Sequence, residues 1–508
     1  MMLGDPDFIP KIRNDLSRKL LNVEAVMKDA VEESAGVLRA TGDSYLAERA
    51  VDIEDAFDRV MGHVLQARRE GHRGQTQVSP SRFIPPGTIL VAKNLKPSEA
   101  LSIRDSGITG IVLEEGGATS HVAILARSWR IPAVMGVRGI IDETADGEEI
   151  ILDAEDGVVV LEPGTDLAAS YRSRLSGGRP RSESEAELLS IAKAPAKTRD
   201  GTLLTLRANI ALADEAVSAR TQGALGVGLF RSEFFFLGSD VTPDEETQFE
   251  AYRRAVEGMK GEPVVIRTLD AGGDKMLGEQ ADLAEKNPLL GWRAVRYCLD
   301  RRDLFRTQLR ALLRASHYGD LRIMFPMISS VEELDSALEV LEEAKAECAE
   351  AGQAFTRRIK TGIMIEIPAA AVCADLLAKK ADFMSIGTND LIQYTMAVDR
   401  ENAKVAHLYD CYNPAVLRMI RMTIEAGRKA RVDVSMCGEM AGDPAAVFLL
   451  MGMGLRNFSM SPALIGPVKE LVRKVSLADA EVLAAAALEL SAAREIRKLV
   501  QERMKTYE

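Results

Sequence analysis

The chain is poor in two chemically versatile residues, with only five histidines and five cysteines among 508 residues. The cysteines stand apart, at positions 298, 348, 373, 411 and 437, and form no CxxC pair. An odd, scattered set argues against a disulfide framework and against a zinc site, and it is typical of reduced proteins. We therefore expect a cytoplasmic location.

The sequence also lacks an excess of basic residues, since its formal net charge is −12. Nucleic-acid binding depends on neutralising phosphates, so we expect no nucleic-acid partner. No apolar run approaches the length of a membrane span, and the N-terminus (MMLGDPDFIPKIRNDL) has no signal-peptide pattern, so we expect no membrane insertion. A local cluster of arginines could still bind a small anion.

Four segments of different texture follow one another in a chain too long for a single hydrophobic core. Residues 1–72 are predicted to be helical, because apolar positions recur at threes and fours. Residues 73–165 are predicted to form an α/β domain with strands in the runs TILVA, GIVL, EIILDA and GVVVL. Residues 166–199 are polar and charged, which predicts a partly helical linker.

Residues 200–508 alternate short apolar runs with long helical stretches. About three hundred residues in this rhythm is the size of a single (β/α)8 TIM barrel, in which buried parallel strands alternate with crossover helices. We therefore predict an α/β multidomain fold that ends in such a barrel. Its eight candidate strands lie in TLLTLRANI, GVGLF, PVVIRTLD, LRIMFPM, TGIMIEIP, ADFMSIGTND, VDVSMCGEM and NFSMS.

Polar side chains follow these candidate strands, at the end where barrel active sites lie. They are Asn209, Arg231, Arg267, Asp270, Glu366, Asn389, Asp390, Cys437 and Glu439. Any one of them could be an ordinary turn residue, but two arginines and several acids at one rim indicate an anion together with a cation. The arginines suit a phosphate or a carboxylate. Glu366 and Asp390 suit a hard divalent ion such as Mg2+.

Two further residues are candidates for proton or covalent chemistry. Cys437 could be a buried small hydrophobe, but its place among polar rim residues also suits an acid or a nucleophile. His121 stands between a Gly-rich turn and a helix-forming stretch in GGATSHVAILARS. The N–H groups of a helix N-terminus disfavour a protonated ring and would stabilise a phosphoryl group on it, whereas the alternative role is helix capping.

Long, ordered blocks of the sequence resemble the phosphoenolpyruvate-utilising enzymes, and within them the Enzyme I branch of the bacterial phosphotransferase system. GGATSHVAILARSWRIPAVMG is similar to the family's phosphohistidine signature, and DFMSIGTNDLIQYTMAVDR is similar to its second signature. Further blocks follow in the family's order: GLFRSEFFF, VIRTLDAGGDK, NPLLGWRAVR, RIMFPMIS, MIEIPAA and MCGEMAGD.

This resemblance implies a phosphoryl relay from phosphoenolpyruvate to a histidine of this chain and on to the phosphocarrier protein HPr or an HPr-like protein, with release of pyruvate. It also implies Mg2+, a swivelling phosphohistidine domain, HPr docking on the helical segment and a homodimer formed through the barrel. The implied residues are His121 as phosphoryl carrier, Cys437 as the acid that protonates the enolate, Arg231, Arg267, Arg293, Asn389 and Arg400 for the substrate, and Glu366 and Asp390 for the metal.

The chain departs from the family pattern in two places. It begins inside the helical segment, so we expect an N-terminally truncated domain, and Ala100 stands where many relatives have threonine. Two alternatives remain: a non-catalytic regulatory remnant that binds phosphoenolpyruvate, and a nitrogen-branch Enzyme I that lacks its GAF domain. An ATP-using relative is disfavoured, because no Gly-rich phosphate loop precedes residue 110.

Overall fold

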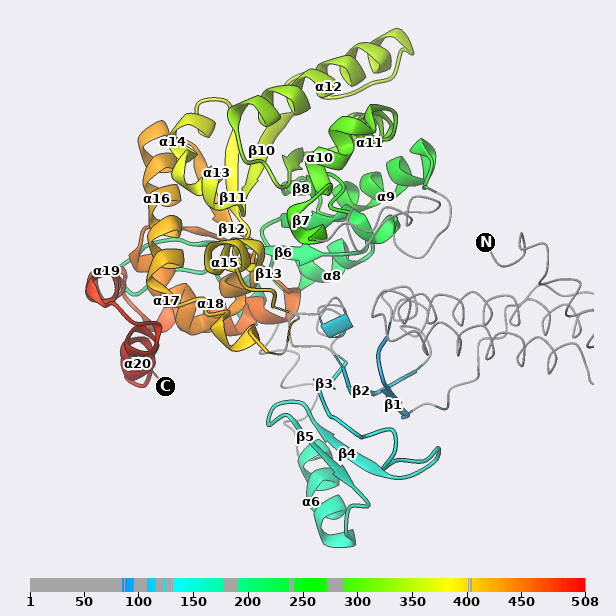
Figure 1. Ribbon diagram of the computed structural model, residues 1–508, viewed down its shortest axis with the longest axis vertical. Helices are drawn as coiled ribbons and strands as arrows, with labels where there is room; N and C mark the ends of the chain where they lie inside the picture. Colours follow the sequence, from blue (N-terminus) through cyan, green and yellow to red (C-terminus); the bar gives the residue numbers. More distant parts are fainter. Residues whose placement is uncertain are drawn as a thin grey trace, which may run out of the picture. The chain divides into compact units, whose positions relative to one another are not determined.

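The computed structural model describes a small α/β region and the long C-terminal part of the chain (Figure 1). The described residues are 87–95, 107–115, 131–176, 190–236, 242–271, 287–400 and 404–507, with Pro85, Val122, Ala123, Ala126, Trp129 and Asn402. His121 and the segment 1–72 that we predict to be helical lie outside them. Val122 and Ala123, which follow His121, are helical, as the sequence predicts.

The α/β region contains a three-stranded parallel sheet and a hairpin. The sheet has the order β1 (Ile89–Ala92), β2 (Gly110–Leu113) and β3 (Ala133–Met135), and the hairpin pairs β4 (Ile150–Asp153) with β5 (Val158–Leu161). The four predicted runs correspond to β1, β2, β4 and β5, whereas β3 was not predicted. Helix α6 (Thr165–Ser176) follows the hairpin, and Tyr171 donates a hydrogen bond to Asp153 (3.1 Å).

The C-terminal part forms a closed barrel of eight parallel strands, in which β13 pairs with β6. Each of the eight predicted runs overlaps one strand along most of that strand's length, so the predicted barrel is confirmed. Most of these strands are buried along nearly their whole length, which explains their largely apolar sequences. The strands are β6 (Thr205–Ile210), β7 (Val227–Arg231), β8 (Val264–Arg267), β9 (Leu321–Phe325), β10 (Lys360–Ile365), β11 (Phe383–Ile386), β12 (Asp433–Met436) and β13 (Asn457–Met460).

Helices surround the barrel strands (Figure 1). The α-helices are α8 (Glu215–Thr221), α9 (Glu245–Gly258), α10 (Ala294–Asp300), α11 (Arg302–Ala315), α12 (Val331–Glu350), α13 (Pro368–Val372), α14 (Ala374–Leu377), α15 (Thr388–Met396), α16 (Pro414–Ala430), α17 (Pro444–Gly452), α18 (Ile465–Lys474), α19 (Leu477–Glu489) and α20 (Ala493–Met504). Short 3-10 turns are η2 (Ser232–Phe235), η5 (Pro288–Leu290), η6 (Ser316–Tyr318), η7 (Ala406–Leu408), η8 (Glu439–Gly442) and η9 (Pro462–Leu464). No helix among the described residues is both long enough and apolar enough to span a membrane.

Local sequence signals explain where several helices begin. The side chain of Asp244 accepts a hydrogen bond from Thr247 N and caps α9, and Ser330 caps α12 in the same way through Glu333 N. Such side chains satisfy N–H groups that the first helical turn leaves unpaired. The barrel helices therefore start at defined residues close to the strand ends.

The barrel has two apolar layers. The large layer lies between strands and helices, and a smaller cluster comprises Leu229, Val265, Met324, Met364, Phe383 and Cys437. Gly228 on β7 leaves space for Ser459 on β13, because a Cβ atom at Gly228 would lie 2.4 Å from the Ser459 Oγ. Tight packing of this kind fixes where the residues at the strand ends point.

We predict that Gly228→Ala lowers the free energy of unfolding by about 1–3 kcal/mol, because the added methyl group overpacks the space occupied by Ser459. Gly466→Ala is the matched control, since no atom lies within 4 Å of its Cβ position on α18. Urea denaturation of the two variants and the wild type measures the difference. Equal stability of both variants would contradict the packing argument.

Candidate active site

Side chains at the carboxyl ends of the strands line one cavity of about 270 Å³. Arg231 and Arg267 are the last residues of β7 and β8, and Glu366 and Cys437 directly follow β10 and β12. Of the nine residues to which the family resemblance assigns roles, the structure places eight around this cavity: Arg231, Arg267, Arg293, Glu366, Asn389, Asp390, Arg400 and Cys437. The ninth, His121, lies outside the described residues. Of the other rim residues expected from the strand ends, Asp270 lines the cavity, whereas Asn209 and Glu439 do not.

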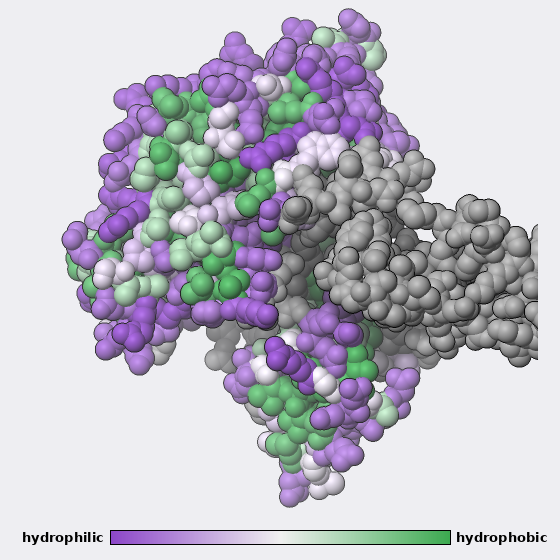
Figure 2. Space-filling view, viewed as in Figure 1, coloured by the Kyte–Doolittle hydropathy of each residue, from purple (hydrophilic) through white to green (hydrophobic). Residues whose placement is uncertain are grey.

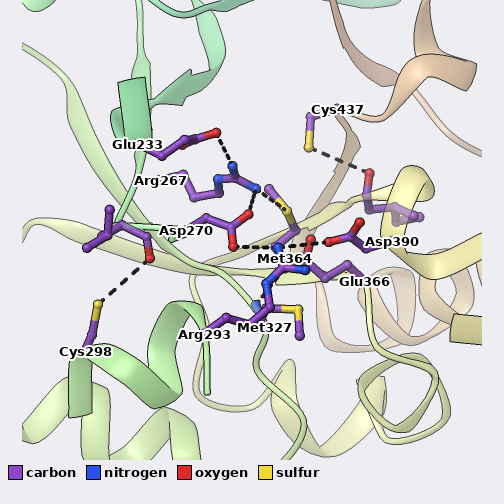
Figure 3. A network of polar contacts seen from close by, with 12 residues as sticks. Glu233, Arg267, Asp270, Arg293, Cys298, Met327, Met364, Glu366, Asp390 and Cys437 are labelled. Carbon is purple, nitrogen blue, oxygen red and sulfur yellow. Dashed lines mark hydrogen bonds and ion pairs between the residues drawn. The ribbon is translucent and has the colours of Figure 1, made fainter. Parts of the chain in front are cut away.

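A chain of ion pairs connects acids and arginines around the cavity (Figure 3). Arg267 Nη2 lies 2.6 Å from Glu233 Oε1, and Arg267 Nη1 lies 2.7 Å from Asp270 Oδ2. Arg293 Nη2 lies 2.8 Å from Asp270 Oδ1 and 3.4 Å from Asp390 Oδ2. Each of these two guanidinium groups therefore contacts two carboxylates.

These contacts determine the charge of both arginines. Burial alone would lower the pKa of Arg267, but Asp270 and Glu233 raise it above its ordinary value. Burial also acts to lower the pKa of Arg293, and Asp270 and Asp390 raise it. A buried guanidinium that is paired and hydrogen-bonded remains protonated, so both arginines are permanent cations.

Arg231 is placed differently. Among the described residues it has neither a hydrogen bond nor an ion pair, although it lines the cavity. Burial lowers its pKa, and the charge of Glu233 opposes this effect only in part. Because a guanidinium stays charged at neutral pH, Arg231 is a cation without an acid partner at the cavity wall. An anionic ligand would supply that partner.

Glu366 and Asp390 form the acidic side of the cavity. Glu366 is 2% exposed, and its Oε1 accepts a hydrogen bond from Met327 N (2.6 Å). Burial raises the pKa of Glu366 to about 8, and the negative charges of Asp390 and Asp270 add to the increase. Acids that repel one another in this way are stabilised by a bound cation.

The donor set fits a hard divalent ion. Carboxylate oxygens are the ligands that Mg2+ prefers, and the ion usually keeps water and substrate oxygens as further ligands. No group of three His, Cys, Asp or Glu side chains in the described part of the chain is arranged to hold a metal. Glu366 and Asp390 would therefore be two protein ligands, with the remaining positions taken by other oxygens.

Asn389 is oriented by its neighbours. Its Oδ1 accepts a hydrogen bond from Glu439 N (3.0 Å), and its backbone carbonyl accepts one from the Tyr409 hydroxyl (3.2 Å). Because the amide oxygen is engaged, the NH2 group is the part of the side chain that can serve a ligand. Arg400 is fixed through its backbone, which donates to Gln393 Oε1 (3.3 Å).

Cys437 is held with its thiol protonated. Its backbone N–H donates to Ile386 O (3.0 Å), and the same carbonyl accepts from the Sγ (3.8 Å). Asn209 Nδ2 donates to Cys437 O (2.8 Å), and Ser459 Oγ donates to Asn209 Oδ1 (2.7 Å). Burial raises the pKa of Cys437, and the hydrogen bond with Ser385 opposes that effect only in part. A thiol that keeps its proton suits an acid better than a nucleophile.

Several polar residues of the cavity region, Glu233 and Tyr394 among them, were not singled out from the sequence. Glu233 is the counter-ion of Arg267, and its only sequence signal is an acid among aromatic residues in GLFRSEFFF. Tyr394 accepts a hydrogen bond from Arg293 Nη1 (3.2 Å) and donates one to Leu289 O (2.6 Å). It belongs to α15, where no sequence pattern distinguishes it from a packing residue.

Comparisons with known proteins match almost the whole chain. Three family models of PEP-utilising enzymes match: the PEP-binding domain at residues 185–477, the mobile domain at 84–157 and the N-terminal domain at 1–49. The chain is 42% identical over 502 residues to the phosphoenolpyruvate-protein phosphotransferase of Geobacillus stearothermophilus, covering 99% of this chain and 85% of that protein. It is 41% identical over 505 residues to the protein of the same name from Bacillus subtilis, with coverage of 99% and 86%.

We predict that Arg231→Met leaves the free energy of unfolding unchanged or higher, because it removes a half-buried charge that has no acid partner among the described residues. The same change should weaken phosphate binding at least about tenfold, the value of one charge-assisted hydrogen bond. Thermal unfolding of both proteins, with and without inorganic phosphate, measures the two effects. An equal phosphate-induced rise of Tm in the variant would contradict the assignment.

Proposed function

The chain belongs to the PEP-utilising enzymes, and on that premise we infer that it is a phosphoenolpyruvate–protein phosphotransferase. It transfers the phosphoryl group of phosphoenolpyruvate to a protein acceptor and releases pyruvate. The observation that carries this inference is the cavity, in which a cation without an acid partner, Arg231, faces two acids suited to a metal, Glu366 and Asp390. Phosphoryl transfer requires such positioning and charge neutralisation.

We assign the substrate-binding roles to residues that line this cavity. Arg231 would bind the phosphoryl oxygens, because it is available to an anion. Arg267 and Arg293 would add positive charge from fixed positions, since their acid partners orient them. Asn389 would donate its NH2 group to the substrate, and Arg400, which also lines the cavity, would bind the phosphate.

Glu366 and Asp390 would hold Mg2+, in agreement with the carboxylate donors that they present. When bound, the ion supplies positive charge that offsets the negative oxygens of the substrate. Transfer of the phosphoryl group leaves the enolate of pyruvate. Cys437 would then give its thiol proton to the methylene carbon of that enolate, and its raised pKa keeps the proton available until the enolate forms.

The phosphoryl carrier that we propose is His121, and HPr or an HPr-like protein is the proposed acceptor. Support for His121 comes from the match of GGATSHVAILARSWRIPAVMG to the phosphohistidine signature. Relatives named as phosphoenolpyruvate-protein phosphotransferases favour catalysis over the non-catalytic remnant considered from the sequence. The proposed HPr-docking segment, 1–72, lies outside the described residues.

We also propose a homodimer formed through the barrel. Apolar surface appears on the face that carries α13, α14 and α16 (Figure 2). Val372 (55% exposed), Leu376 (46%) and Met422 (42%) belong to these three neighbouring helices. Burial of such side chains against a second copy would favour association. A cytoplasmic location is supported by the five cysteines, all of which are free.

The function is tested with 32P-labelled phosphoenolpyruvate and Mg2+. We expect an acid-labile label on the wild type and on His317→Ala, whose histidine is exposed, and no label on His121→Ala. Addition of HPr should remove the label from the wild type. A label that persists on His121→Ala would disprove the assigned carrier, and a label that HPr does not remove would disprove the assigned acceptor.

The raised pKa of Glu366 makes metal binding depend on pH. A protonated carboxyl group must lose its proton to bind Mg2+, so a pKa of about 8 predicts weaker binding below pH 8 and a constant affinity above it. At pH 7 about one proton should be released for each ion bound. Calorimetry in two buffers with different ionisation enthalpies measures that proton. Affinity and proton release that do not change between pH 6 and 9 would contradict the prediction.

A further inference from the structure

Asp270 pairs with two arginines of the cavity at the same time. Its Oδ2 lies 2.7 Å from Arg267 Nη1, and its Oδ1 lies 2.8 Å from Arg293 Nη2. The two arginines come from separate elements, the last residue of β8 and the residue before α10. One carboxylate, only 5% exposed, therefore sets the spacing of two guanidinium groups.

The backbone on both sides of Asp270 is held in place. On one side, Leu269 N donates to Gln308 Oε1 on α11 (2.9 Å). On the other side, Ala271 O accepts from Ala294 N (2.9 Å), the first residue of α10. Asp270 is thus anchored to both α10 and α11 independently of its side chain.

Glu233, the other acid that pairs with Arg267, lies next to a residue that is held by the same side chain, Gln308. Gln308 Nε2 donates to the Oγ of Ser232 (3.1 Å), the residue before Glu233. Glu233 Oε1 in turn lies 2.6 Å from Arg267 Nη2. A single buried side chain on α11 therefore holds the backbone beside Asp270 and the hydroxyl group of the residue before Glu233, the two acids that orient Arg267.

We propose that Asp270 is a positioning residue for phosphoryl transfer, an inference that rests on the function proposed above. Both of its oxygens are engaged by guanidinium groups, so it acts through Arg267 and Arg293. Each guanidinium has five N–H donors, and the acids occupy only some of them. Asp270 turns the remaining donors toward the cavity and keeps them there before the substrate arrives. Fixed donors stabilise a transition state more than mobile ones do.

Asp270→Asn separates this role from simple substrate binding. The amide keeps one oxygen, but its NH2 group faces a guanidinium donor, so one arginine loses both its partner and its orientation. Arg231 forms no ion pair with Asp270 and still binds the phosphoryl group. We therefore expect kcat to fall about a hundredfold, the cost of a misplaced catalytic group, while KM for phosphoenolpyruvate changes less than about fivefold.

The matched control is Asp320→Asn, which breaks the same kind of pair at the opposite end of the barrel. Asp320 precedes β9 and binds Arg322 through both oxygens, with Nε–Oδ1 at 3.1 Å and Nη2–Oδ2 at 2.6 Å. The assay is exchange of label between phosphoenolpyruvate and 14C-pyruvate with Mg2+, because it needs no acceptor protein. Circular dichroism and Tm verify that each variant is folded.

A lower kcat with nearly constant KM in Asp270→Asn, and wild-type values in Asp320→Asn, is the expected result. The inference alone is overturned if Asp270→Asn keeps its kcat, if only its KM rises, or if both variants lose activity equally. If wild type shows no exchange, the proposed function fails and the inference falls with it. If Asp270→Asn does not fold, the same measurement is made on Asp270→Glu. A folded Asp270→Glu variant with wild-type kcat would overturn the inference, whereas a reduced kcat at wild-type KM would support it.

Discussion

Burying a charge in a protein is costly unless an opposite charge pairs with it, and this constraint orders the carboxyl end of the barrel. Glu233, Asp270 and Asp390 alternate with Arg267 and Arg293, so that each of these guanidinium groups contacts two acids. The alternation keeps both arginines protonated in spite of their burial. Such a series of ion pairs tolerates little movement, because displacement of one side chain leaves the neighbouring charge unpaired.

The barrel supplies the rigidity that such a chain requires, partly through unusual backbone angles. Met327 and Ala294 adopt positive φ angles of 55° and 54°, which cost roughly 1–3 kcal/mol each for residues other than glycine. In this conformation Met327 N donates to Glu366 and Ala294 N donates to Ala271 O. The strained residues therefore hold an acid of the proposed metal site and the helix that follows Arg293.

Sequence patterns were sufficient to predict the barrel and to predict that the cavity lies at the carboxyl ends of its strands. Parallel barrel strands are mostly apolar, and polar residues after them mark the rim, which is why all eight predicted runs overlap strands. The pairing of charges was not predictable, because Glu233 and Arg267 are 34 positions apart and Asp270 and Arg293 are 23 apart. The three-residue strand β3 was too short to show a period. The proposal that His121 carries the phosphoryl group rests on the sequence motif around it, because His121 lies outside the described residues.

The function proposed for this chain requires that the cavity at the strand ends recognise the phosphoryl group of phosphoenolpyruvate. The most direct test is a calorimetric titration of the full chain at saturating Mg2+, first with phosphoenolpyruvate and then with pyruvate, which lacks that group. We expect one phosphoenolpyruvate bound per chain and at least about a hundredfold weaker binding of pyruvate, since two or more charge-assisted hydrogen bonds are lost. Equal affinity for the two compounds would contradict it.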